Sequence, residues 1–293
     1  ISGVKIDTPE SNYVGAIVGS FSGTVIDNCR VIFKEGSEIS GLDYVGGVAG
    51  IMDGFVSGCV VESQIPEFVI NGLDYVGGVA GGCYNSCCDR CMVNANIGGR
   101  LYVGGIVGEG RGSTYYPDLA LNCGFIGKII GNSSVGGIAG FSNAIIQACM
   151  AKIDMVVEDD KAGGICGYGV SSTIVACYAD GNISAPRSAG EIAGLIGDAW
   201  NCHGELSYST VSCSAQQYRP FFRSDGGLTD CATVFSGSSS YGNVMYNCTD
   251  ITTFIREAYS KHADLWNLDN TWTWTGTVDG KEVSVSCPRL AWE

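Results

Sequence analysis

The sequence is poor in proline and histidine, and its cationic side chains are outnumbered by acidic ones. It has 6 prolines and 2 histidines among 293 residues, and its 16 Lys and Arg against 30 Asp and Glu give a formal net charge of −14. The scarcity of proline excludes collagen-like chains and proline-rich linkers. The acidic balance offers no basic surface to nucleic acid or to an anionic membrane, so we expect neither as a partner.

Long apolar runs and amphipathic helical patterns are also missing. No uninterrupted apolar stretch approaches the roughly 18 residues that a membrane helix needs, so we expect no membrane span in this chain. Glycine accounts for 44 residues, and stretches such as VGGVAG hold too much of it for a helix interior. The chain opens at Ile1 without Met or an apolar leader, and we expect a secreted or surface protein whose signal segment was removed.

What the sequence does contain is a glycine-rich motif in seven copies. The copies are YVGAIVG, YVGGVAG, YVGGVAG, YVGGIVG, SVGGIAG, KAGGICG and SAGEIAG, and their second residues are Val14, Val45, Val76, Val103, Val135, Ala162 and Ala189. These residues lie 27 to 32 positions apart. The minimal unit is therefore 27 residues long, and we place the insertions of the longer units in outer loops.

A cysteine recurs once in each repeat, at a nearly constant distance after this motif. It follows the second motif residue after 14, 15 or 20 positions, at Cys29, Cys59, Cys91, Cys123, Cys149 and Cys177. We predict that these cysteines stack as a ladder with one rung per unit, because a free thiol packs as a compact buried hydrophobic group. The cadence continues less regularly at Cys213, Cys231 and Cys248.

Each unit has the length and composition of one coil of a parallel β-helix. In residues 161–187, the pieces KAGGICGY, STIVACYA and GNISAP are typical of three short strands separated by turns. We expect the glycines to supply positive φ at the corners and to let the coils approach closely. A propeller blade needs about 40 residues. We therefore predict an all-β fold, a right-handed parallel β-helix (β-solenoid) over residues 1–249.

The repeat resembles the GLUG motif. The VGG[VI][AV]G core and the later strand CYADGNIS at 177–184 carry this resemblance, which covers roughly residues 13–200. The motif recurs in bacterial surface proteins and in the N-terminal regions of IgA-specific metalloendopeptidases. The resemblance implies a right-handed β-helix, exposure on a bacterial cell surface and no activity of the motif itself. No H-E-x-x-H zinc-peptidase motif occurs in this chain. Val or Ile replaces the usual Leu at Ile17, Val48, Val79, Ile106, Ile138, Ile165 and Ile192.

The composition changes from about residue 250, and we predict a C-terminal cap over residues 250–293 that packs on the solenoid. The segment 252–266 has one apolar face and predicts a helix. Within 271–286, two alternating runs flank Asp279-Gly280, which predicts a β-hairpin with a type I′ turn. Trp272 and Trp274 would share one face of that hairpin, where they either bind sugar rings or cover the open end of the core.

A dense cysteine cluster and two lone histidines are the first candidates for chemistry. The run CYNSCCDRC holds Cys83, Cys87, Cys88 and Cys91. These thiols could bind zinc, form a local disulfide from Cys83, or simply pack in the core, and we assign no metal and no cofactor. His203 stands between Cys202 and Glu205, but adjacent strand residues point to opposite faces, so we interpret it as a loop or surface residue. We assign His262 to the cap helix.

Acidic and aromatic positions complete the candidates. Glu158, Asp159, Asp160 and Lys161 would suit a polysaccharide lyase or glycoside hydrolase, and a solvated turn explains them more simply. Three tyrosines recur just before the glycine motif, with Tyr13 ahead of them, and predict a stacked column whose outer face could bind a ligand. They are Tyr44, Tyr75 and Tyr102.

We assign no catalytic residue. The sequence therefore favours a non-catalytic, adhesin-like protein of the bacterial surface that binds a host glycan or extracellular protein, or acts as a spacer. Two alternatives stay open. One is a polysaccharide-cleaving enzyme on a β-helix scaffold, and the other is a substrate-engaging module of a larger surface protein.

Overall fold

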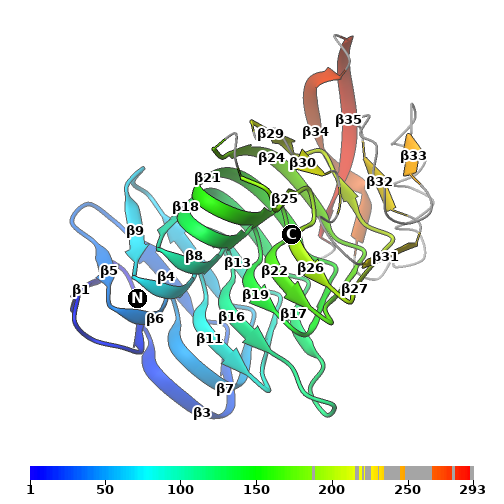
Figure 1. Cartoon of the computed structure of the whole chain (residues 1–293). Helices are drawn as coiled ribbons and strands as arrows, with labels where there is room; N and C mark the ends of the chain where they lie inside the picture. Colours follow the sequence, from blue (N-terminus) through cyan, green and yellow to red (C-terminus); the bar gives the residue numbers. More distant parts are fainter. Residues whose placement is uncertain are drawn as a thin grey trace.

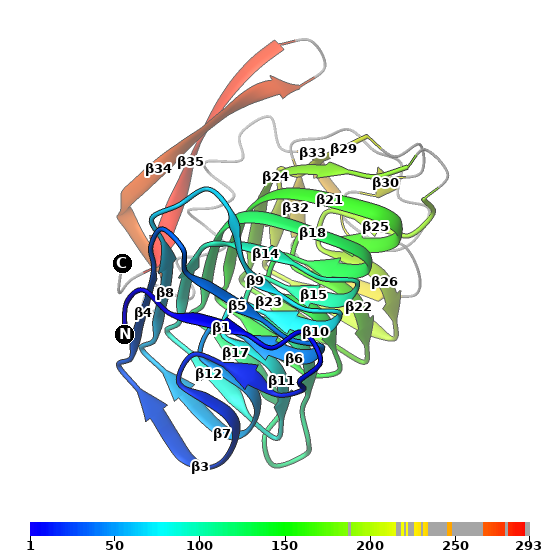
Figure 2. The same cartoon turned by 90° about the vertical axis from the view of Figure 1, so that its left-hand side faces the viewer.

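A computed structural model describes residues 1–186, 189–214, 218–219, 221, 226–229, 231–233, 245–247, 266–278 and 281–290. This part of the chain is all-β, and its parallel strands stack as a β-solenoid of about 7 turns. Figures 1 and 2 show the turns lying side by side in chain order. The predicted all-β parallel solenoid is confirmed. The described residues include no helix that is long and apolar enough to cross a membrane.

Two parallel sheets form the walls of the solenoid, with 20 and 13 described strands. The larger sheet contains β1 (Lys5–Asp7), β2 (Val14–Gly15), β4 (Arg30–Phe33), β5 (Glu38–Ser40), β6 (Asp43–Gly46), β8 (Val60–Ser63), β9 (Phe68–Asn71), β10 (Asp74–Gly77), β13 (Met92–Asn94), β14 (Asn96–Gly98), β15 (Leu101–Gly104), β18 (Gly124–Gly136), β21 (Met150–Gly163), β24 (Tyr178–Ser184), β25 (Ile192–Ala193), β28 (Tyr208–Ser209), β29 (Ser212–Cys213), β30 (Tyr218–Arg219), β32 (Cys231–Thr233) and β33 (Met245–Asn247). The smaller sheet contains β3 (Val18–Asp27), β7 (Ala49–Ser57), β11 (Ala80–Tyr84), β12 (Cys87–Asp89), β16 (Val107–Arg111), β17 (Asp118–Leu121), β19 (Ala139–Ser142), β20 (Ile145–Gln147), β22 (Cys166–Val170), β23 (Thr173–Val175), β26 (Ile196–Trp200), β27 (Cys202–Glu205) and β31 (Gly226–Thr229).

Equivalent residues of successive turns stand in register and fill the core. The second residues of the first six motif copies pair in order along the larger sheet, at Val14, Val45, Val76, Val103, Val135 and Ala162. Val14 keeps 7% of its surface exposed in the first turn, whereas the other five are fully buried. Each buried valine contributes about 1.5–3 kcal/mol through its lost contact with water. The repeat is therefore a stack of identical core layers.

The seventh motif copy lies three residues later than the sequence suggested. Ala162 pairs with Ile192 rather than with Ala189, and Cys166 pairs with Ile196. The seventh copy is thus EIAGLIG at 191–197, and Leu195 occupies the position assigned to Ile192. Gly197 takes the place of the last motif glycine, where a Cβ would come within 2.6 Å of the carbonyl oxygen of Ala162 in the preceding turn.

The corners at the glycine motif are built differently from the prediction. Positive φ is adopted by the first residue of each of the first six motif copies, including Tyr44 (56°), Tyr75 (60°) and Tyr102 (54°), and by none of the described motif glycines, whereas glycine supplies it at another corner, Gly58 (59°). The motif glycines serve the second predicted purpose, close approach between turns. A Cβ on Gly108 would lie 2.5 Å from the carbonyl carbon of Tyr75 and 2.6 Å from the carbonyl oxygen of Gly81. Positive φ and close approach between turns are therefore separate requirements. The residue that opens the motif meets the first, and the motif glycines meet the second.

The C-terminal segment contains the predicted hairpin. Strand β34 (Trp266–Val278) pairs antiparallel with β35 (Lys281–Leu290), with Val278 opposite Lys281. Residues 252–265 of the predicted helix and the turn at 279–280 lie outside the described residues. Trp266, predicted as the last helical residue, begins β34 instead. Packing of a cap over 250–293 on the solenoid stays a prediction.

Candidate functional site

Four tyrosines form a stacked column along the outside of the solenoid. Ring centroids are 5.4 Å apart for Tyr13 and Tyr44, 4.4 Å for Tyr44 and Tyr75, and 5.2 Å for Tyr75 and Tyr102. All three pairs are stacked, with interplanar angles of 26° or less. The rings of Tyr44 and Tyr75 therefore have both faces covered by neighbours. The column presents ring edges and hydroxyl groups, and the inner rings are closed to a stacking sugar.

Aromatic contacts continue beyond the tyrosines on the smaller sheet. Tyr102 meets Phe141 edge-to-face at 5.9 Å, and Phe141 meets Tyr168 at 5.5 Å. Phe141 and Tyr168 are in register with each other and with Glu109. Glu109, Phe141 and Tyr168 were not predicted as site residues, although each directly follows the last glycine of a motif copy. Phe141 at this position contacts the last ring of the tyrosine column.

A polar network joins the column to a nearly buried carboxylate. The hydroxyls of Tyr44 and Tyr84 are 3.2 Å apart, and the Tyr84 hydroxyl donates to Oε2 of Glu109. Arg111 donates to Oε1 of Glu109 from Nε (3.0 Å) and Nη2 (2.6 Å), and its Cζ lies 5.2 Å from the Phe141 ring centroid. The side chain of Glu109 is 5% exposed and that of Arg111 is 52% exposed. The guanidinium thus compensates the buried charge and still reaches solvent.

The phenols of this face stay protonated at neutral pH. Burial raises the pKa of Tyr44, and burial together with the charge of Glu109 raises the pKa of Tyr75 to about 12. Burial and the hydrogen bond to Glu109 raise the pKa of Tyr84. The face therefore offers hydroxyl donors and acceptors, ring edges and one guanidinium, which suits binding. We call the set Tyr44, Tyr84, Glu109, Arg111 and Phe141 the aromatic face.

The acidic run before the sixth motif is largely structural. One carboxylate oxygen of Asp160 accepts the backbone N–H groups of Lys161 (2.9 Å), Gly190 (3.2 Å) and Glu191 (3.0 Å). The Nζ of Lys161 lies 2.8 Å from Asp198 and 3.5 Å from Glu191, and 4.5 Å from the Tyr168 ring centroid. Glu158 and Asp159, on β21, are exposed. Asp160 and Lys161 thus fasten one turn to the next.

The six cysteines of the predicted ladder stand opposite one another in adjacent turns, as the register of the strands that follow them requires. They also form hydrogen bonds. The N–H of Cys123 donates to Sγ of Cys149 (3.4 Å), and the N–H of Cys149 donates to Sγ of Cys177 (3.3 Å). The Cys149 thiol donates in turn to the carbonyl of Gln147, two residues earlier. Burial raises the pKa of Cys123 and Cys149 well above the usual value, so these thiols stay protonated.

A serine occupies the next rung of the ladder. The N–H of Cys177 donates to Oγ of Ser207 (3.0 Å), and this hydroxyl donates to the carbonyl of Glu205. Cys231 follows Ser207 in register, because Tyr208 pairs with Ala232. Cys213 pairs with Ile183 and is not a rung, and Cys248 lies outside the described residues. The irregular cadence after Cys177 thus reflects one substituted rung.

The cysteine cluster on β11 and β12 is buried. Cys83, Cys87, Cys88 and Cys91 are free thiols, and Cys91 belongs to the ladder. Hydrogen bonding to Cys83, and then burial, raise the pKa of Cys88 well above the usual value, which disfavours the thiolate that zinc requires. In the part of the chain that the structure covers, no group of three or more His, Cys, Asp or Glu side chains is placed to hold a metal ion.

The remaining candidates are spread over the molecule. Cys202 is buried and His203 is half-buried on β27, where adjacent side chains face opposite sides. His262 lies outside the described residues. Trp272 and Trp274 lie on β34, opposite Cys287 and Val285 of the hairpin. The structure brings Tyr44, Tyr75 and Tyr102 together, and the side chains of the two tryptophans lie outside its described part.

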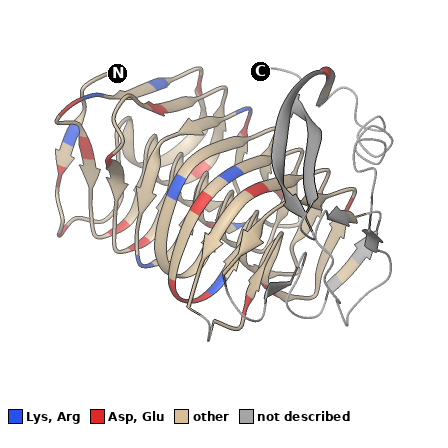
Figure 3. Cartoon of the chain, turned by 90° about the horizontal axis from the view of Figure 1, so that it is seen from above, with Lys and Arg blue, Asp and Glu red and all other residues tan. Residues whose placement is uncertain are grey.

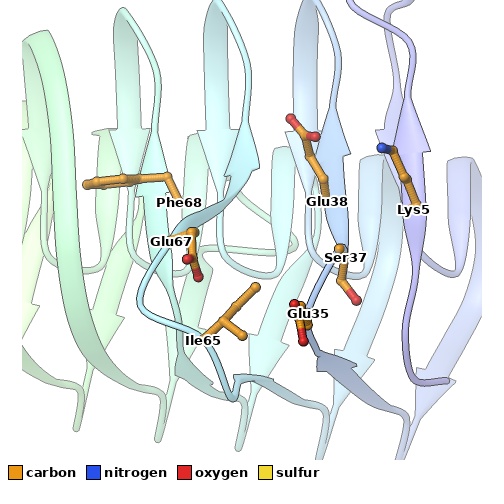
Figure 4. A pocket seen from close by; sticks show the side chains of 8 residues that line it. Lys5, Glu35, Ser37, Glu38, Ile65, Glu67 and Phe68 are labelled. Carbon is orange, nitrogen blue, oxygen red and sulfur yellow. The ribbon is translucent and has the colours of Figure 1, made fainter.

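A separate shallow pocket lies near the N-terminus, between β1, β5 and β9. It has a volume of about 340 Å³, and its charged lining residues are Lys5, Glu35, Glu38 and Glu67. Figure 4 shows these side chains arriving from neighbouring turns. Figure 3 shows Lys and Arg scattered over the described turns and not aligned in one stripe.

The fold and the aromatic face define a repeat protein of the parallel β-solenoid class. No family model and no curated protein matches the chain. Among solved structures, it is similar to a crystal structure described as a putative immunoglobulin A1 protease from Bacteroides ovatus. The TM-score is 0.53 and the identity 15%, over 94% of this chain and 87% of that one. At this identity the similarity establishes the fold alone, and the GLUG resemblance stays a prediction.

Proposed function

We propose that the chain is a non-catalytic, GLUG-repeat protein of a bacterial surface, and that it binds a host glycan or extracellular protein on its aromatic face. The observation that carries this proposal is the placement of Arg111. Its guanidinium lies over the Phe141 ring and against Glu109, while about half of the Arg111 side chain remains exposed. Arginine and aromatic groups gathered on a rigid surface are the groups that dominate binding energy in known interfaces.

Three further observations support the proposal. The phenols of the face have raised pKa values and so are poor nucleophiles and bases at neutral pH. One carboxylate oxygen of Asp160 accepts three backbone N–H groups, which fits a structural role. The likeness in fold to a protein described as a putative immunoglobulin A1 protease is consistent with the GLUG resemblance, which also extends to IgA-specific metalloendopeptidases.

The test combines a binding screen with a turnover assay. Purified chain is screened against immobilised host glycans and extracellular proteins, and the same preparation is incubated with polysaccharides while reducing ends are counted. We expect binding without product release. The variant R111A should weaken binding about tenfold, because it removes an exposed arginine of the interface.

Arg90 provides the matched control. It forms an exposed ion pair with Asp89 on another part of the surface, and the variant R90A should bind as the parent chain does. Release of oligosaccharides by the parent chain would replace this proposal with the enzyme alternative. Equal binding by R111A and the parent would show that the ligand does not bind at the aromatic face.

A further inference from the structure

The unit with the longest interval carries an ordered loop that projects from the solenoid. Residues 112–117 connect β16 to β17, and their loop extends beyond the coils at the bottom of Figure 1. The N–H of Gly112 donates to Oδ1 of Asn143 (2.9 Å), and the N–H of Ser113 donates to the carbonyl of Tyr116 (2.9 Å). The first bond ties the loop to the next turn and the second closes it on itself. These two hydrogen bonds anchor the backbone of the loop.

This loop displays two tyrosines over an exposed apolar row. Tyr115 is 88% exposed and Tyr116 is 47% exposed. Tyr116 meets Phe55 edge-to-face at 5.9 Å, and Phe55 is itself 40% exposed. Val25, in register with Phe55 on the preceding turn, is 50% exposed. Contiguous exposed aromatic groups of this kind mark an interaction site, because a surface without a partner gains nothing from leaving them in water.

We call Val25, Phe55, Tyr115 and Tyr116 the loop platform. It differs from the tyrosine column in the exposure of its ring faces. The inner rings of the column are covered on both faces by their neighbours, whereas Tyr115 has most of its surface open. Among the described aromatic side chains Tyr115 has the largest exposed fraction, so the loop platform can offer a ring face to a flat apolar ligand surface. The C–H face of a pyranose ring is such a surface.

The charges around the platform select among glycans. Strands β3 and β7 and residues 112–118 contain no Lys or Arg. Arg111 precedes the loop and Arg90 donates to Ser57 of β7, but each is paired with a carboxylate, Glu109 and Asp89 respectively. Asp53 lies two residues before Phe55, and Asp118 directly follows the loop. Carboxylates accept hydrogen bonds from sugar hydroxyls and repel uronates and sialic acids. The net charge of −14 strengthens that repulsion.

We propose that the loop platform is a binding site for neutral pyranose sugars, with one sugar ring stacked on Tyr115 or Tyr116 and its hydroxyls bound by Asp118 or Asp53. This inference rests on the proposed function, because it assigns a second site and a ligand class to a non-catalytic surface binder. The inserted loop supplies the ring faces, and the repeated turns supply a rigid base.

The experiment measures binding of neutral hexose oligosaccharides and of uronate oligosaccharides of matched length by titration calorimetry. The parent chain should bind the neutral set and not the uronates. Y115A/Y116A should weaken binding about tenfold, as loss of an aromatic contact does. Y115F/Y116F should retain most of it, because the ring faces remain. Urea unfolding midpoints equal to that of the parent would show that both variants are folded.

The outcomes separate this site from the aromatic face. If R111A loses binding and Y115A/Y116A does not, the loop platform is refuted and the proposed function stands. If neutral sugars fail to bind, if uronates bind equally well, or if Y115A/Y116A loses only a protein partner, the assignment to neutral sugars is wrong. Turnover of any oligosaccharide would overturn the proposed function separately.

Discussion

At the scale of single residues, the ladder cysteines act as hydrogen-bonding groups as well as small apolar ones. The residue before Cys149 has φ of 51°, and in this left-handed turn the backbone of one rung finds its acceptor in the sulfur of the next. The sequence predicted the ladder from its spacing but explained it by packing alone. Ser207 shows that the rung also needs a hydrogen-bond acceptor, because its hydroxyl accepts the N–H of Cys177 where the other rungs use a sulfur.

The hydrogen bond to Sγ of Cys149 predicts different costs for two small substitutions at this residue. C149A removes the acceptor of the Cys123 N–H and should destabilise the fold by about 1–3 kcal/mol, the cost of a buried donor without a partner. C149S keeps a donor and an acceptor, as Ser207 does, and should cost less. Urea unfolding of both variants is the measurement. If Ala were tolerated better than Ser, the rung would be an apolar packing position only.

The raised pKa of Tyr75 predicts loss of stability at alkaline pH. Its folded-state pKa of about 12 lies above the ordinary tyrosine pKa of 10.0, so the folded state favours the neutral phenol. This contribution is complete below pH 10 and is lost as the pH rises through 12. The unfolding midpoint of the parent should fall across that window, and Y75F should fall less. Parallel pH profiles of the two proteins would contradict the assignment.

At the scale of the repeated element, the sequence predicted that the motif glycines provide both positive φ and close approach between turns. Close approach belongs to the motif glycines, and positive φ belongs to the preceding tyrosine, serine or lysine. Residue type alone could not separate these roles, because tyrosine is uncommon in left-handed backbone. The shifted seventh copy has a similar cause. Small residues at 189, 190, 193 and 194 imitate the motif, and only contacts between turns fix the register.

The steric role predicts a large difference between two glycine substitutions. In G108A the added Cβ would meet the backbone of the preceding turn at 2.5 Å, so the turns must separate, at a cost of about 1–3 kcal/mol. In G98A the nearest atom is the side-chain oxygen of Asn71, at 2.9 Å, which can move aside. Thermal unfolding should show a lower midpoint for G108A than for G98A. Similar midpoints would contradict the prediction that a side chain at Gly108 forces neighbouring turns apart.

The candidate site was predictable only in part. The tyrosine column follows from identical residues at identical motif positions, whereas Glu109, Phe141 and Tyr168 share a position without sharing chemistry. A search for identical residues cannot find such a row. A search for the residue after each last motif glycine would have found it, since the parallel register aligns that position from turn to turn.

At the scale of the whole molecule, the central claim is that each repeat makes one turn around a common axis. Stacking places residues far apart in sequence on one straight row, and it creates two surfaces, the aromatic face and the loop platform. Strand spacing along such a row is about 4.8 Å per turn. Distance along the row therefore measures the number of turns between two residues.

The most direct test is a pair of distances between nitroxide labels introduced as noncanonical amino acids at Asp27, Gln147 and Glu205. Gln147 lies four turns and Glu205 six turns from Asp27 along one row of paired residues. Electron double resonance should give separations between these backbone positions of about 19 Å and about 29 Å, once the label length is allowed for. Distances that do not grow in proportion to the number of turns would contradict the solenoid and the account built on it.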